Sequence, residues 1–435
     1  MTSKNEKDCL NYIQQRYYPT LSRLTLNFKR PVQKFVKQMV YGIISSRSSI
    51  VQRVAKEQKE KISLKKTCDR LYRNLKRSPL YSRLMTNHLL LNSRSIKRYS
   101  PIFIDLSDIS KETASKMKGL SQVWDGSEGE WNKGYFTLQA STCDLDKRKK
   151  LQLLYSELFS IKEECTSENE KIMQLLREIA VISGNKGIIV GDRGLDRIRL
   201  LNYMLENKMK FIIRGKKRNL IYRGKSSSYY EISKDMDLRY KVVSKQRKFR
   251  VGVTRVGIKL PNPPSRKYAR KRKRYFYFVA AKEELKNGEK GYIYYLCNIK
   301  DEVSEQKLAK MAVNYYGMRW SIEEVHRQIK EDLEWESMQL LTYESLKNMN
   351  ALVWLAASFI YNEVGKMVNY LVKKLPGRML YRNKVKELFK NLAYRLTDVV
   401  SYLFRLFAVR PRKKYGGYYQ KYNKKRQQLT MESIL

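Results

Sequence analysis

The sequence predicts an α/β protein with helical regions at both ends. Three observations support this. Between residues 101 and 214, short apolar runs typical of buried strands alternate with amphipathic helical patterns, which is the order found in α/β sheets. Apolar residues at helical spacing cover much of the first hundred residues and return from about residue 303. The chain has 435 residues, of which 42% are hydrophobic, so it is long enough to bury cores in more than one domain.

The charge balance indicates a polyanionic partner. Lys and Arg number 90 against 42 Asp and Glu, a net charge of +48. A protein this positive repels itself unless polyanions lie close by. This argues against an ordinary enzyme of small neutral metabolites and favours nucleic acid as the partner.

The first hundred residues carry a large excess of positive charge, with 23 basic residues against 5 acidic ones. Their apolar positions, for example Phe35, Met39 and Ile43, recur at helical spacing. We expect a compact helical bundle that binds DNA. The alternative is a basic helical scaffold that does not touch DNA.

The α/β region begins with a predicted strand over 101–106 and a second over 134–143. Ser167 and Glu170 form the S-x-x-E pattern of a capping box, which predicts a helix through residue 182. The Gly184 to Gly187 turn ends it. A strand over 188–192, a helix over about 195–207 and a strand over 211–214 complete the alternation.

Between about 215 and 300 the alternation gives way to β-type segments, at 240–243, 249–254, 275–280 and 292–297. A cluster of basic residues, Arg266 to Arg274, lies between two of them. We expect a β-rich insertion with a basic loop that is not part of the main sheet. Helices resume from about 303 to 407, followed by a Lys/Tyr/Gly-rich tail.

Two aspartates follow predicted strands. Asp105 comes after an Ile-Phe-Ile run and Asp192 after Ile-Ile-Val-Gly, so each is expected at the carboxyl end of a buried strand, where open α/β sheets place their sites. Carboxylates are hard ligands suited to Mg²⁺ or Mn²⁺. Two such residues alone are equally consistent with helix caps or loop positions.

A third acidic residue lies on a predicted helix over 314–330. At about 100° per residue, Tyr316, Arg319, Glu323 and Lys330 project within about 60° of one another. A separate apolar stripe can dock the helix on a sheet; it consists of Met318, Ile322, Val325, Ile329 and Leu333. The alternative is a solvated charged face with an Arg319–Glu323 pair, worth only a few tenths of a kcal/mol.

The spacing Tyr316-x2-Arg319-x3-Glu323-x6-Lys330 resembles, without a gap, the Y-R-E-K signature of the DDE transposases of insertion sequence family 4, the group that includes the Tn-five transposase. The resemblance spans roughly residues 100–340. It implies an RNase H-like catalytic core with a β-rich insertion. It also implies a catalytic, metal-binding triad for Mg²⁺ or Mn²⁺, with two ions per active site, formed by Asp105, Asp192 and Glu323.

The resemblance further implies contacts with DNA. Arg214 and Lys216 match the positions where the family places basic residues on transposon-end DNA. Tyr316, Arg319 and Lys330 would contact phosphates. For stacking on a flipped base the candidates are Trp320, Tyr295 and its neighbour Tyr294. Because the chain has 32 tyrosines, a core role is the favoured interpretation for any one of them.

Pattern and resemblance together divide the chain into five parts. They are 1–98, a helical DNA-binding domain; 99–214, the first part of the core; 215–300, the β-rich insertion; 301–340, the second part of the core with the catalytic Glu helix; and 341–435, a helical C-terminal region with a basic tail.

The implied function is that of a DNA transposase. It would bind transposon ends and target DNA as a homodimer in a synaptic complex, and carry out cut-and-paste transposition through a hairpin intermediate. The alternatives are a non-transposing or domesticated DDE nuclease and, from another class, a non-catalytic nucleic-acid-binding protein. The longest apolar stretch, 351–361, is too short to cross a bilayer, so we expect no membrane partner and a cytoplasmic, nucleoid-associated protein of a bacterial or archaeal host.

Overall fold

The computed structural model describes residues 4–77, 80–125, 129–145, 150–164, 167–260, 272–284, 291–299, 303–363, 400–401 and 404–405. The predicted helices beyond residue 363, the basic tail and most of the basic cluster that begins at Arg266 lie outside these residues.

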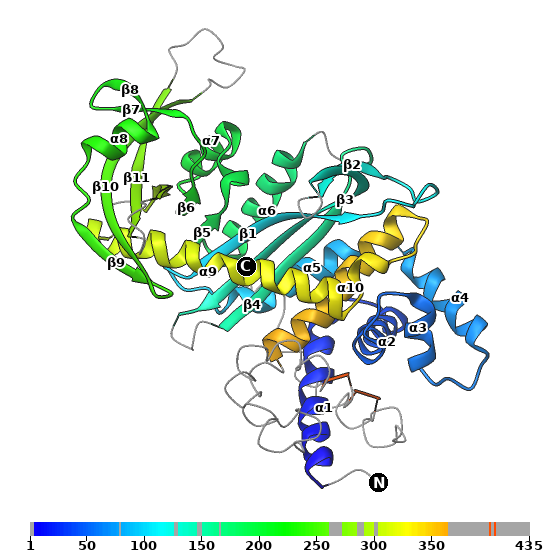
Figure 1. Ribbon diagram of the computed structural model, residues 1–435. Helices are drawn as coiled ribbons and strands as arrows, with labels where there is room; N and C mark the ends of the chain where they lie inside the picture. The colour runs from blue at the N-terminus through cyan, green and yellow to red at the C-terminus, as the bar shows by residue number, and fades with distance from the viewer. Residues whose placement is uncertain are drawn as a thin grey trace.

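A mixed five-stranded arrangement forms the centre of the molecule (Figure 1). The strand order is β4-β3-β1-β5-β6; β3 is antiparallel to both β1 and β4, whereas β5 runs parallel to β1 and β6. The strands are β1 (Pro101–Ser110), β3 (Glu130–Asp144), β4 (Lys150–Phe159), β5 (Ile188–Gly191) and β6 (Phe211–Arg214), and β2 (Ser121–Asp125) forms a hairpin with β3. The α/β class is confirmed, whereas β2 and β4 have no counterpart among the predicted strands.

The β-rich insertion continues this sheet, so the prediction that it stands apart was wrong. Strand β12 pairs antiparallel with β6, Leu296 opposite Ile213. Without this pairing β6 would be an open edge with unpaired backbone groups. One sheet of twelve strands results within the described residues. The insertion consists of β7 (Asn219–Tyr222), β8 (Lys225–Ser228), α8 (Tyr229–Asp235), β9 (Tyr240–Ser244), β10 (Arg247–Leu260), β11 (Arg272–Glu284) and β12 (Tyr292–Asn298).

Helices cover both faces of the central strands. On β1, Phe103 packs in a cluster with Ala312 and Ile322 of α9 (Glu305–Asp332). Its neighbour Ile104 packs in a different cluster, together with residues of α6 (Glu168–Ser183) and α7 (Ile198–Glu206). Because successive side chains on a strand point to opposite faces, α9 lies on one face and α6 and α7 on the other. The predicted docking of the 314–330 helix on a sheet is confirmed.

The N-terminal residues form the expected group of helices. Most of the group lies at the far end of the molecule from the insertion, whereas its last helix packs on β4 and α6 (Figure 1). They are α1 (Lys4–Leu24), α2 (Arg30–Ser46), α3 (Val51–Glu57), α4 (Leu64–Leu75) and α5 (Leu80–Ser93). Helix α10 (Tyr343–Ser358) packs on α2, α5 and β4, and a π-helical turn, Phe359–Glu363, follows it. Within the described residues, no helix combines the length and apolarity needed to cross a bilayer.

Helix α6 begins and ends where the sequence predicts, but its first turn is closed differently. Ser167 is the residue before the helix, yet its hydroxyl makes no capping hydrogen bond. The amide N–H of Glu170 instead donates to the main-chain oxygen of Ser167. The predicted capping box was therefore wrong. Gly184 ends the helix in the left-handed conformation, with φ +61°, which favours glycine.

Candidate active site

Asp105 and Asp192 lie at equivalent positions on neighbouring parallel strands. Phe103 of β1 is in register with Val190 of β5, and each aspartate comes two residues later, so both share the face of Phe103 and Val190. Helix α9 covers this face. Asp192 directly follows β5, as predicted. Asp105 lies inside β1, which continues to Ser110; the prediction that it ends its strand was wrong, because antiparallel pairing with β3 extends β1.

Arg319 of α9 joins two of the three predicted acids. Its Nη1 lies 2.9 Å from Oδ1 of Asp105, and its Nη2 forms an ion pair with Oε1 of Glu323. Arg319 is only 8% exposed. Burial alone would lower the pKa of its guanidinium, but the carboxylates of Asp105 and Glu323 raise it above the ordinary value. The Arg319–Glu323 pair of the alternative interpretation is therefore present. Its arginine is buried beside β1, and its glutamate is partly exposed, with 33% of the side chain accessible.

His326 is a site residue that the sequence analysis missed. Its Nδ1 lies 3.2 Å from Oδ2 of Asp105, so both oxygens of that carboxylate have partners. The imidazole is buried. A signal was available, since His326 falls about 20° from Arg319 on the helical wheel.

Tyr316 lies between two arginines. Arg214, the last residue of β6, donates from Nη1 to its hydroxyl at 3.0 Å, and the guanidinium carbons of Arg214 and Arg319 lie 5.4 and 5.6 Å from its ring centre. Tyr295 packs beside Tyr316 with ring centres 5.5 Å apart and is 2% exposed. This burial favours the core role for Tyr295, because the ring has no open face for a base. It also raises the pKa of the Tyr295 phenol.

The remaining predicted DNA contacts have different surroundings. The Lys216 side chain is exposed, while its main-chain N–H donates to Asp196. Lys330 forms an ion pair with Glu336, Nζ to Oε1 2.8 Å. Trp320 is 64% exposed, so its indole can meet a ligand from solvent.

The surroundings of the three acids bear on metal binding. Among the described residues, no three His, Cys, Asp or Glu side chains are grouped so as to hold a metal ion. The carboxylate of Asp192 accepts a hydrogen bond from the Gly194 N–H at 2.7 Å. The donor set still suits a hard divalent cation, and the Arg319 guanidinium already brings a positive charge between Asp105 and Glu323.

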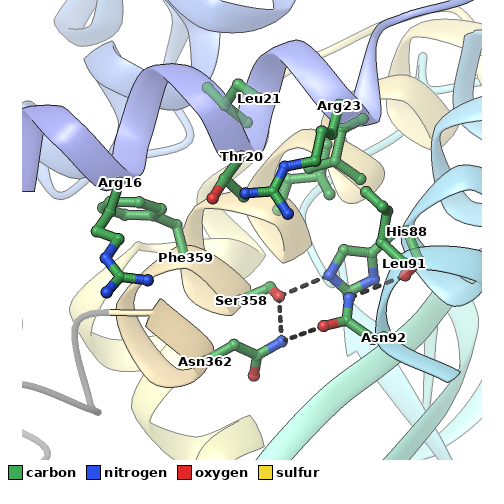
Figure 2. A pocket seen from close by; sticks show the side chains of 12 residues that line it. Arg16, Thr20, Leu21, Arg23, His88, Leu91, Asn92, Ser358, Phe359 and Asn362 are labelled. Atoms are coloured by element: carbon green, nitrogen blue, oxygen red, sulfur yellow. Dashed lines mark hydrogen bonds between the residues drawn. The ribbon is translucent and has the colours of Figure 1, made fainter. Parts of the chain in front are cut away.

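A pocket of about 200 Å³ lies elsewhere, between α1, α5 and the end of α10 (Figure 2). Arg16, Thr20 and Arg23 of α1 line it, and no acidic residue does. Opposite them, His88 contacts Ser358 at 2.6 Å, and Asn362 donates to the Ser358 hydroxyl at 2.8 Å. His88, Ser358 and Asn362 already have hydrogen-bond partners in the protein. The pocket therefore gives no evidence of a preformed ligand-binding site.

Two comparisons with known proteins find a similarity, and the two similarities differ in weight. A search of curated proteins finds no match. Among solved structures the chain is similar to the cryo-EM structure of the piggyBac transposase synaptic complex with hairpin DNA, with 13% sequence identity and a TM-score of 0.36, over 95% of this chain and 82% of that chain. A likeness this distant does not indicate a shared site.

The second result concerns the part of the chain that carries two of the three acids. Residues 149–359, slightly less than half of the chain, match the family described as Transposase DDE domain. The matched stretch contains Asp192, Arg214 and the whole of α9, and it begins after Asp105. The region from β4 to the end of α10 is thus matched to a transposase DDE domain.

Proposed function

We propose that this chain is a DDE transposase that binds transposon ends and cleaves and joins DNA strands. The observation that carries the proposal is the common register of Asp105 and Asp192 on the face crossed by α9, where Arg319 links Asp105 to Glu323. The match of residues 149–359 to a transposase DDE domain supports the same reading. So does the net charge of +48, which suits a DNA partner.

We assign metal binding to the three acids: Asp105, Asp192 and Glu323 would together hold two Mg²⁺ or Mn²⁺ ions. When bound, such ions supply charge stabilisation for phosphodiester cleavage and activate the attacking oxygen. The protein's own part is to bring carboxylates from β1, β5 and α9 to one face of the sheet and to hold the DNA strand beside them. The β4-β3-β1-β5-β6 order supports an RNase H-like core.

The DNA strand would be held by Arg214, Lys216, Tyr316 and Lys330, with Trp320 as a stacking residue. Arg suits bidentate contact with phosphate, and Lys acts as a compact charge. Arg319 is buried between carboxylates, so it would have to leave them to reach a phosphate. Binding through several phosphates should weaken steeply as salt is raised, and a flat response would count against this interface.

The finer features of the proposal come from the sequence resemblance. We propose membership of the insertion sequence family 4 group with its Y-R-E-K signature, cut-and-paste transposition through a hairpin intermediate, and a homodimer in the synaptic complex. Residues 1–98 would bind the end sequence, and a bacterial or archaeal host is expected.

The test compares Asp105→Asn with the unaltered protein on labelled transposon-end DNA in Mg²⁺. We expect loss of nicking by at least a hundredfold, with end binding within about twofold, because the substitution removes a ligand charge and leaves the basic surface intact. Asp108→Asn, three residues along the same strand, is the matched control and should nick normally. Retained nicking by Asp105→Asn would refute the triad.

Strand-transfer products separate the proposed function from its alternatives. A non-transposing or domesticated nuclease would nick DNA with the same triad but would not join a transposon end to target DNA. A non-catalytic nucleic-acid-binding protein would bind DNA and leave it intact at every Mg²⁺ concentration. Gel analysis of end and target DNA incubated together distinguishes the three outcomes.

A further inference from the structure

We propose that His326 is a positioning residue that holds the Asp105 carboxylate in the orientation needed for metal binding. The inference rests on the proposed function and deepens it, since it assigns a role to a residue outside the Y-R-E-K spacing. Three features carry it. The two oxygens of Asp105 contact different groups, packing fixes the imidazole, and the side chain opposite Asp105 on the neighbouring strand makes no hydrogen bond to it.

The two oxygens of Asp105 are held by different groups. Oδ1 accepts from Arg319 and Oδ2 contacts His326. Arg319 is shared with Glu323 and lies between two of the proposed metal ligands, so its bond to Asp105 competes with any cation that enters there. His326 approaches Asp105 from the other oxygen. It can therefore keep its contact while Arg319 turns to another partner.

The polarity of the contact follows from the chemistry of the pair. A carboxylate oxygen can only accept a hydrogen bond when the group is ionised, so a hydrogen bond at this contact would use Nδ1 of His326 as its donor. Both side chains are buried, and a contact between an imidazole nitrogen and a carboxylate oxygen is electrostatically stronger where water is excluded. Nε2 of His326 has no hydrogen-bond partner among the described residues, so no hydrogen bond at Nε2 orients the ring.

Two indoles orient it instead. The rings of Trp335 and Trp354 lie 6.3 and 6.2 Å from the imidazole, centre to centre. Both tryptophans are fully buried, and Trp335 is itself fixed by a 3.1 Å hydrogen bond from its indole N–H to Asn350. A ring packed between rigid neighbours presents its Nδ1 in one direction. This is how a supporting group keeps a metal ligand within the narrow range that chemistry requires.

The neighbouring strand does not hold Asp105 in this way. Gln139 of β3 is directly opposite Asp105 in the sheet. It is fully buried, and neither its amide oxygen nor its amide nitrogen has a hydrogen-bond partner within the described residues. The cross-strand side chain therefore makes no bond to the carboxylate. Once Arg319 is engaged elsewhere, His326 is the group that fixes the carboxylate.

The test uses three substitutions of His326 that separate its donor from its bulk. Asn places an amide N–H near the position of Nδ1, Gln reaches toward the position of Nε2, and Leu has no donor. Five quantities are measured for each full-length variant: Mn²⁺ affinity without DNA, kcat for nicking, KM for nicking, end-DNA affinity, and urea unfolding. His88→Leu, at the other histidine of the chain, is the matched control for loss of a buried imidazole.

We expect His326→Asn to stay within about threefold of the unaltered protein in Mn²⁺ affinity and kcat. His326→Gln and His326→Leu should lose about 10- to 100-fold in both, the usual cost of removing a supporting partner of a metal ligand. End-DNA affinity and KM should change less than about twofold. His88→Leu should lower stability and leave Mn²⁺ affinity unchanged.

Two results would overturn the inference. One is a normal Mn²⁺ affinity and kcat in His326→Leu; the other is an equal loss in all three variants that follows their loss of stability. The Asp105→Asn protein separates this failure from that of the proposed function. If Asp105→Asn does not nick while His326→Leu does, only the role of His326 fails; if Asp105→Asn nicks, the triad itself is wrong.

Discussion

Arg319 binds Asp105 at 2.9 Å and at the same time pairs with Glu323, so one buried guanidinium spans two carboxylates that come from β1 and α9. A metal ion bound by these two acids would compete with the Arg319 guanidinium for the same carboxylate oxygens. The arrangement stabilises the fold in the absence of metal, because two carboxylates close together would otherwise repel each other. Under the proposed function, Arg319 would reach DNA only after another cation takes its place between the two carboxylates.

Replacing Arg319 by Met should therefore change metal affinity and stability in opposite directions. Without the guanidinium, Asp105 and Glu323 lose their cation, and we expect the free energy of unfolding in metal-free buffer to fall by about 3 kcal/mol. Mn²⁺ should then bind the DNA-free protein roughly tenfold more tightly, since it no longer displaces a competing charge. Mn²⁺ titration and urea unfolding with and without Mn²⁺ measure both effects.

Arg327→Met on the same helix is the control. Arg327 forms an exposed pair with Glu324, so its loss should cost no more than about 0.5 kcal/mol and leave Mn²⁺ affinity unchanged. Weaker Mn²⁺ binding by Arg319→Met would contradict the competition argument and would mean that Arg319 supports the metal ligands.

Substitutions of Trp320 and Tyr295 should affect different properties, because Trp320 is a surface aromatic residue and Tyr295 is a core one. Trp320→Ala removes an exposed indole, so we expect a loss of end-DNA affinity of about fivefold or more if a base stacks on it, with stability within about 0.5 kcal/mol. Tyr295→Ala opens a cavity beside Tyr316 and should cost about 3 kcal/mol. Fluorescence anisotropy and urea unfolding measure the two effects. Trp124→Ala, at an exposed indole in β2, is the control; an equal loss of DNA affinity there would remove the special role of Trp320.

Local patterns predicted the elements that place the acids. The Ile-Ile-Val-Gly run before Asp192 is β5, Gly184 ends α6, and the apolar stripe through Ile322 and Ile329 is the buried face of α9. These features depend on residues close in sequence, whose spacing fixes which side of a strand or helix is apolar. The approach of Asp192 to the other acids is a long-range relationship, and it remains a prediction.

Other features could not be predicted from local patterns. The joining of β12 to β6 depends on which edge a distant strand meets, and the spacing of residues does not encode it. The burial of Arg319 depends on how close α9 lies to β1, which only the fold shows. The helical wheel gives only the direction in which the Arg319 side chain leaves the helix. His326 faces Asp105 because α9 crosses β1 at that level, so its role became visible only when both elements were placed.

His88 should make stability fall in mild acid. Burial lowers the pKa of its imidazole to about 4, because the charged ring would lose its hydration inside the protein. The hydrogen bond with the Leu154 carbonyl acts in the opposite direction but is the smaller effect. The unfolded chain has an ordinary histidine pKa near 6.5, so it binds a proton first as pH falls. The contribution of neutral His88 to the free energy of unfolding is present above pH 6.5 and is lost progressively toward pH 4. The loss is about 2 kcal/mol at pH 5 and roughly 3 kcal/mol at pH 4 and below. Urea unfolding at pH 7.5, 6 and 5 measures this loss.

His88→Gln should be less stable at pH 7.5 and should lose most of this decline, since glutamine does not titrate. The decline contributed by other groups remains in both proteins and cancels when the two curves are subtracted. Parallel curves for the two proteins would contradict the assignment of the acid sensitivity to His88.

The end of α9 is attached to the N-terminal helices by a polar contact that should affect both stability and catalysis. Arg47 binds Asp332 at 2.9 Å, and Arg53 and Ser48 both bind the Glu334 carboxylate. Arg47 and Glu334 each have positive φ, 55° and 47°, a conformation that costs energy outside glycine. The contact must stabilise these residues against that strain. It also fixes the helix nine residues after Glu323.

We predict that Arg47→Met lowers the free energy of unfolding by roughly 1–2 kcal/mol, less than for a fully buried pair because Arg47 is partly exposed. Asp332→Asn should cost a similar amount, and the double variant should cost less than the sum. Nicking should slow several-fold while end-DNA affinity stays within about twofold, because the contact holds the helix of Glu323 and not the DNA. Single-turnover nicking and a double-mutant cycle in urea measure these effects. A clear coupling energy with unchanged nicking would mean that the sheet alone positions α9 for catalysis.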